Sequence, residues 1–194
     1  MVARRWASLA GPALCALIVA AGAAATRDPK AMVLRLSDIP SGFFVQSQGY
    51  ESLRAAAAGS PFTVAQYKAW GYLSYYEVDY ELAATGTKVL TGPLEIASSA
   101  SVYKTAAGAA ASFAASRAQC PKHGRLFSTN APIGDGSFGC VYSTSKSGVP
   151  VVVYVLTWHR GPCKAGIVVD GLSTAVSATR AVGLARLEDT RIRA

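Results

Sequence analysis

The feature that most constrains this fold is a set of three apolar runs near the C-terminus joined by very short connections. The runs cover residues 138–145, 151–159 and 165–170, and the links between them read Ser-Lys-Ser-Gly and Arg-Gly-Pro-Cys-Lys. Parallel neighbours need a crossover of a dozen or more residues, whereas antiparallel neighbours need only a tight turn. We therefore predict an antiparallel meander in this part of the chain.

An alternating segment upstream predicts a strand with one buried face. In the stretch YYEVDYEL, apolar and acidic side chains fall on opposite faces of an extended backbone. The predicted buried face carries Tyr76, Val78, Tyr80 and Leu82, and the predicted solvated face carries Glu77, Asp79 and Glu81. Residues 89–97 can return as the antiparallel partner of this strand, with a break or bulge at Gly92-Pro93.

Helices are interspersed with these strands. Asp28-Pro29 and Ser60-Pro61 each provide an N-cap followed by proline at the first helical position. The alanine-rich stretch 99–118 has helical periodicity from Val102 to Arg117, and a last helix opens near Gly171. Its predicted inward stripe is Val176, Thr179, Gly183 and Leu187. The fold class is therefore α+β, a single antiparallel β-sheet with helices packed mainly on one face.

The N-terminus has the pattern of an export signal. Arg4 and Arg5 precede an apolar run, and small residues at Ala23 and Ala25 predict cleavage near Thr26. Residues 1–25 are thus a predicted signal peptide, and 26–194 form one predicted α+β domain, secreted or otherwise extracytoplasmic. The alternative is that 1–25 stay attached as an N-terminal membrane anchor.

Charge limits the partners that the chain can have. The formal net charge of +8 includes Arg4 and Arg5, so it falls to about +6 once the signal is removed. A basic domain can be attracted to anionic envelope polymers or lipid headgroups. Nucleic-acid binding is not predicted, because no basic stripe with interleaved aromatics and no known module is present.

Cysteine usage predicts one disulfide. Removal of Cys15 with the signal leaves Cys120, Cys140 and Cys163. An odd number in an oxidising compartment indicates one disulfide and one remaining thiol, or a bridge to another chain. Three intramolecular pairings are open. The absence of a C-x-x-C pair gives no support to a redox pair or a zinc site.

The stretch IGDGSFGCVY (residues 133–142) matches the glycine-rich loop of protein kinases. The next strand, however, carries Tyr154 where a kinase has its phosphate-binding lysine, and no H-R-D or D-F-G sequence follows. A dinucleotide fingerprint must open a helix, whereas a strand follows here. We interpret Gly134, Gly136 and Gly139 as a tight turn or bulge at the entry to a strand.

No catalytic, metal or cofactor site is predicted. The two histidines, His123 and His159, form no H-x-x-x-H pair, and there is no G-x-S-x-G motif. Trp158, His159 and Arg160 are expected at a hairpin tip, where a large side chain is hard to bury. We predict that these three residues form a binding surface.

Several segments together resemble a family of uncharacterised exported bacterial proteins: LRLSDIPSGF, YKAWGYLSYYEVDY, IASSASVYKTAAGAAASF, IGDGSFG and LARLEDTRI. More distantly, the order of elements is similar to PsbP-like domains and to the extracellular kinase-sensor domains of actinobacterial envelope proteins. The resemblance implies an antiparallel sheet with packed helices and a binding, sensing or scaffold role outside the cytoplasm. It carries over no catalytic residue.

Three functions are consistent with these observations. The first is a non-enzymatic binding domain of the cell envelope or exterior, whose partner is an unknown small molecule, a saccharide or an envelope protein. The second is a secreted hydrolase whose polar residues converge only in the folded chain. The third is a structural or adhesive envelope protein that is held to an anionic polymer by charge.

Overall fold

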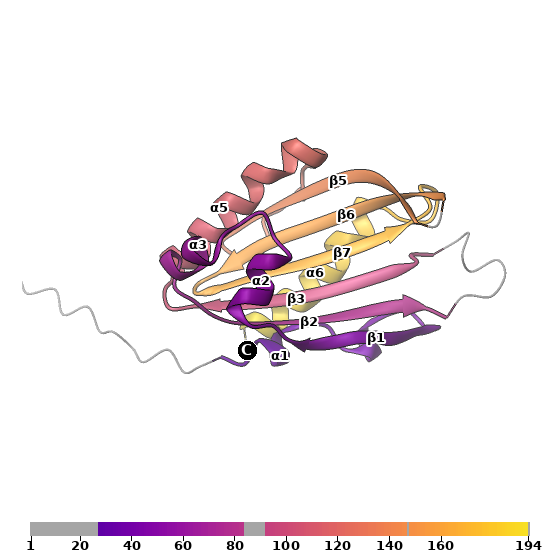
Figure 1. The fold of residues 1–194 in the computed structure, drawn as a ribbon. Helices are drawn as coiled ribbons and strands as arrows, with labels where there is room; N and C mark the ends of the chain where they lie inside the picture. The colour runs from indigo at the N-terminus through magenta and orange to yellow at the C-terminus, as the bar shows by residue number, and fades with distance from the viewer. Residues whose placement is uncertain (1–26, 84–91, 147, 194) are drawn as a thin grey trace, which may run out of the picture.

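A computed structural model describes residues 27–83, 92–146 and 148–193, which form one seven-stranded sheet (Figure 1). Every neighbouring pair is antiparallel, in the order β1-β2-β3-β7-β6-β5-β4. The predicted α+β class with a single antiparallel sheet is confirmed. The strands are β1 Phe43–Tyr50, β2 Tyr72–Leu82, β3 Glu95–Tyr103, β4 Arg125–Phe127, β5 Gly136–Lys146, β6 Val149–Arg160 and β7 Cys163–Gly171.

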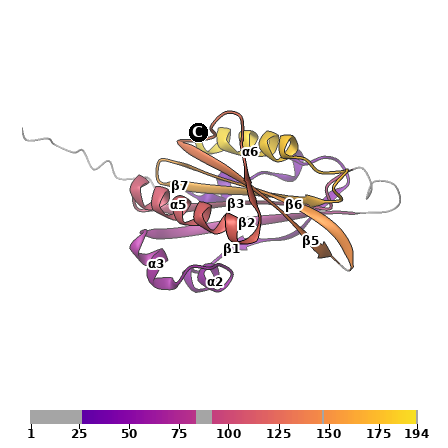
Figure 2. The same cartoon turned by 90° about the horizontal axis from the view of Figure 1, so that it is seen from above.

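The helices divide between the two faces of the sheet, whereas the sequence placed them mainly on one. Helices α1 and α6 cover one face, and α2, α3 and α5 lie on the other (Figure 2). Among the described residues, no helix is both long and apolar enough to cross a bilayer. The elements are α1 Pro29–Met32, the 3-10 turn η1 Leu36–Asp38, α2 Leu53–Ala58, α3 Val64–Ala69, α5 Ala106–His123 and α6 Ala178–Arg193.

The sheet consists of two meanders that meet at its centre. Strands β1 to β3 form one and β4 to β7 the other, and β3 pairs with β7 between them. Helix α5 follows β3 and carries the chain across β7, β6 and β5 to the far edge at β4. Gly108 lets the start of α5 approach α3, since a Cβ at this position would lie 1.9 Å from the carbonyl oxygen of Trp70.

The main core lies between the sheet and helices α1 and α6. The predicted buried face of β2 is confirmed, and its side chains pack with others from the central strands. The inward stripe predicted for the last helix is mostly wrong: Thr179, Gly183 and Leu187 are exposed, and Val176, which is buried, precedes the helix because α6 begins at Ala178. The buried residues of α6 are instead Ala181, Ala185, Glu188, Asp189 and Ile192. The Glu188 and Asp189 carboxylates point inward because Ser98 and Arg160 of the sheet donate hydrogen bonds to them.

Two predicted helix boundaries are also corrected. Thr63, not Ser60, is the N-cap of α3, because its hydroxyl and the side chain of Gln66 satisfy each other's backbone N–H groups. Val102 lies in β3, and α5 begins only after the Thr105 cap. The predicted signal at 1–25, its cleavage position and the turn after β2 fall outside the described residues.

The glycine-rich stretch forms a turn that enters strand β5, as the sequence predicted. Gly134 has φ +64°, and a Cβ there would lie 2.2 Å from the carbonyl oxygen of His159. The amide of Asp135 donates to that same oxygen at 2.7 Å, and β5 begins at Gly136. A strand therefore follows the glycines, which differs from a nucleotide loop that opens a helix.

Candidate ligand-binding cavity

A cavity of about 500 Å³ lies on the sheet face opposite α6. Strands β2, β3, β5, β6 and β7 supply its floor, and helix α5 and the α2–α3 segment supply its cover. The volume falls within the range of small-molecule sites in proteins. The cavity exists because α5 crosses only one half of the sheet and α2–α3 approaches from the other half.

The strand register arranges the floor in three rows. The first row joins Tyr75 of β2, Ser101 of β3 and Lys164 of β7. The second row continues with Glu77, Ser99, Gly166 and Thr157. The third row contains Val168, Val155 and Cys140. Polarity therefore decreases along β7, from a lysine through a glycine to a valine.

Aromatic side chains form one wall of the cavity. Tyr67 meets Phe62 and Tyr72 edge to face, with ring centroids 6.2 and 5.4 Å apart. All three residues line the cavity. Burial is the main cause that raises the pKa of Tyr72 well above its usual value, so its hydroxyl stays neutral. The wall offers apolar faces with a neutral hydroxyl, which suits a ligand with an apolar body.

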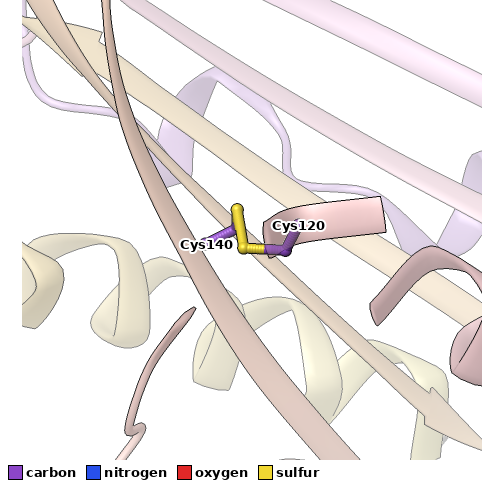
Figure 3. The surroundings of a disulfide bond; sticks show 2 residues. All are labelled: Cys120 and Cys140. Carbon is purple, nitrogen blue, oxygen red and sulfur yellow. A yellow bond between two sulfur atoms is a disulfide. The ribbon is translucent and has the colours of Figure 1, made fainter. Parts of the chain in front are cut away.

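A disulfide closes the opposite end. Cys120 near the end of α5 is bonded to Cys140 of β5, with the two Cα atoms 5.8 Å apart (Figure 3). Of the three pairings left open by the sequence, the structure contains this one. Cys163 is a free, buried thiol in the core on the opposite face. Because both disulfide cysteines line the cavity, the bond fixes the helix that covers it.

Lys164 places a cation in the floor beneath α5. Its Nζ donates to Ser112 Oγ and Ser116 Oγ, each at 3.1 Å. Desolvation of the ammonium group lowers the pKa of Lys164 to about 8. The side chain still carries its positive charge at neutral pH, although burial disfavours the charged form.

Glu77 provides an acidic group on the β2 side of the cavity. Burial, followed by the nearby Asp79 and Glu51 carboxylates, raises the pKa of Glu77 to about 7. Asp79 accepts a hydrogen bond from Ser47 of β1. The predicted solvated face of β2 is therefore only partly correct: Glu81 is exposed, whereas Glu77 and Asp79 are half-buried.

The surface predicted at Trp158, His159 and Arg160 loses its tryptophan, whereas His159 and Arg160 are partly exposed. Trp158 is 0% exposed, because β6 continues to Arg160 and the tryptophan lies inside the strand between Ser137 and Ala165. The His159 ring packs on Phe113 of α5 with the centroids 4.8 Å apart. Arg160 binds Asp189 of α6. The tip of the hairpin is at Gly161, beyond all three.

The two histidines are not brought together. His159 packs near Phe113, and His123 lies at the other end of α5 on the edge of the cavity. Phe113 and His123 are ten positions apart in α5, which corresponds to roughly 15 Å along the helix. In the ranges 27–83, 92–146 and 148–193, no group of three His, Cys, Asp or Glu side chains could hold a metal ion.

Sequence reasoning missed Lys164 and the floor around it. The available signal was a single lysine in an otherwise apolar strand, in the stretch CKAGIVV. A lone charge at a strand position normally faces water. Only the path of α5 across β7 shows that this lysine is covered.

The fold is similar to that of a solved extracellular domain. The crystal structure of the extracellular domain of PknH from Mycobacterium tuberculosis matches with a TM-score of 0.51 and 9% sequence identity. The match covers 84% of this chain and 95% of that chain. This supports the resemblance to extracellular sensor domains at the level of the fold, and the PsbP-like resemblance stays a prediction. No protein-family model and no curated protein matches the chain.

Proposed function

We propose that this chain is an extracytoplasmic, non-enzymatic domain that binds a small molecule in the cavity between the sheet and α5. The observation that carries the proposal is the cavity itself: about 500 Å³, with an aromatic wall, an apolar end and a few polar groups. Such a combination is typical of small-molecule sites.

Location outside the cytoplasm is supported by three observations. The N-terminal sequence has the pattern of an export signal. The Cys120–Cys140 disulfide is of a kind that persists in oxidising compartments. The similar fold of PknH belongs to an extracellular domain.

A neutral apolar fluorophore, N-phenyl-1-naphthylamine, tests the cavity directly. Gly166 lies in the floor, and a Cβ added there would meet only Ser99 Oγ at 3.3 Å and the Leu156 carbonyl oxygen at 3.6 Å. Gly166→Leu therefore fills the cavity from its floor once the Ser99 side chain shifts slightly. Gly183→Leu is the matched control, because nothing lies within 4 Å of a Cβ at that position on α6.

We expect the fluorophore to bind the wild type and Gly183→Leu with equal affinity, and to bind Gly166→Leu at least tenfold more weakly. Equal binding to all three proteins would place the fluorophore elsewhere and would contradict the proposal. Circular dichroism melting of each variant shows whether the fold is retained.

A further inference from the structure

Lys164 is a cation whose hydrogen-bond acceptors are neutral hydroxyl groups. Its two acceptors are the hydroxyls of Ser112 and Ser116, and the Ser116 hydroxyl donates onward to the Ser112 carbonyl oxygen at 3.0 Å. The Tyr103 hydroxyl lies 2.8 Å from Ser112 Oγ. Within the described ranges no carboxylate pairs with this ammonium group. Removing a cation from water is unfavourable unless an anion meets it.

The acidic groups of the cavity lie on its other side. Glu77 and Lys164 belong to strands separated by β3, and their positions differ by one row of the register. With strands about 4.8 Å apart and residues about 3.4 Å apart, the two Cα atoms are roughly 12 Å from each other. Glu51 and Asp79 lie on the Glu77 side as well. An anion is thus attracted to the β7 side of the floor and repelled from the β2 side.

The floor becomes apolar along β7 away from Lys164. Lys164, Gly166 and Val168 face the cavity in succession, and Val168 lies roughly 13 Å from Lys164 along the strand. Val155 of β6 lies beside Val168, and Phe138 of β5 lies in the same row as Gly166, one strand beyond Thr157. The cavity thus has a cationic end, a polar middle and an apolar end.

We propose that the cavity takes an anionic amphiphile, a molecule whose carboxylate or phosphate oxygens accept hydrogen bonds from Lys164 and whose apolar body packs on Val155, Val168 and Phe138. This inference rests on the proposed function and names the chemical class of its ligand. The oxyanion places a negative charge beside the Lys164 ammonium group. Charge-assisted hydrogen bonds of this kind are stronger than neutral ones.

Three ligands with the same alkyl chain test the proposal: dodecanoate, dodecyl phosphate and the neutral dodecanol. Each is titrated by calorimetry into the protein recovered from outside the cytoplasm of an export-competent host, the two anions below their critical micelle concentrations and the alcohol below its solubility limit. We expect at least one of the two anions to bind tenfold or more tightly than the alcohol at 0.15 M salt. The anion that binds more tightly identifies the headgroup.

Lys164→Met retains the apolar stem of the lysine and removes its charge. We expect the preference for the anion to disappear in this variant. Lys122→Met, an exposed lysine on the same helix that covers the cavity, makes the same change in net charge and should keep the preference. A preference that survives in Lys164→Met, or that falls equally in both variants, would overturn the proposal.

If Lys164→Met does not fold, the affinities of the three ligands for the wild type alone test the proposal. Suppose that the anions and the alcohol bind the wild type with equal affinity and that Gly166→Leu binds none of them. That result would overturn this inference and leave the proposed function standing. If none of the three ligands binds and N-phenyl-1-naphthylamine does not bind either, both proposals fail.

Discussion

Arg160 of β6 and Asp189 of α6 form a bidentate ion pair: Nε donates to Oδ1 and an Nη to Oδ2, each at 2.9 Å. Arg193 donates to the same carboxylate from one turn further along α6. Although burial raises the pKa of Asp189, the hydrogen bonds from the two arginines outweigh it and lower the pKa. The pair fixes α6 on the sheet face opposite the cavity.

Asp189→Ala should lower the free energy of unfolding by about 2 to 3 kcal/mol, because it leaves Arg160 without its partner. The value lies below the range for a fully buried pair, since the Arg160 side chain is 27% exposed. Arg193→Ala should cost less than about 1 kcal/mol, because 62% of that side chain is exposed. Urea denaturation measures the free energy of unfolding of both variants. Equal losses would contradict the view that Arg160 contributes more than Arg193 to the stability of this ion pair.

Glu188 introduces a pH dependence into the core. Burial raises the pKa of Glu188 well above its usual value, although the Ser98 hydroxyl donates to its Oε2. The folded chain therefore binds more protons than the unfolded chain above pH 4.5, and stability falls as pH rises from there. Glu188→Gln should remove this fall and be more stable than the wild type at neutral pH. Parallel stability curves from pH 4.5 to 8 would contradict the assignment.

Lys164 should destabilise the protein when no ligand is bound. Its pKa of about 8 lies below the 10.5 of the unfolded chain, so the unfolded state binds more protons between these values and stability rises with pH across this window. Lys164→Met should abolish that rise and stabilise the free protein at pH 7 by about 1 kcal/mol, allowing for solvent screening. Thermal melts at pH 7 and pH 10 measure both effects. A loss of stability at pH 7 would show that the lysine has a structural role.

The Cys120–Cys140 bond should contribute about 3 kcal/mol, as expected for a loop of 20 residues. The double variant Cys120→Ser/Cys140→Ser should lose this amount in urea denaturation, and reduction of the wild type should bring it to the same value. Cys163→Ala leaves the bond intact, so its stability should remain sensitive to reduction. An oxidised wild type no more stable than the reduced one would refute the contribution.

Local signals predicted much of the framework. The alternation in β2 identified its buried face, Asp28 capped the first helix, and the short links after residue 136 gave the β5–β6–β7 meander. These features depend on neighbours in sequence, which is the information that a pattern contains.

The inward face of α6 and the cavity depend on distant partners. Glu188 and Asp189 are buried because Ser98 and Arg160 meet them, and those partners lie 90 and 29 residues away in sequence. Trp158 was misplaced because the strand extends two residues beyond it before the hairpin turns. Lys164 lies in the ligand-binding cavity because α5 covers it, and no local sequence pattern indicates that contact.

Native mass spectrometry of protein exported by a host cell tests the central claim, that the cavity holds a small molecule. Wild type, Gly166→Leu and Gly183→Leu are purified in parallel from outside the cytoplasm. The wild type and Gly183→Leu should carry the same bound mass, and Gly166→Leu should lack it, since its new side chain occupies the floor of the cavity. An equal bound mass on Gly166→Leu would show that the molecule is held elsewhere and would contradict the account.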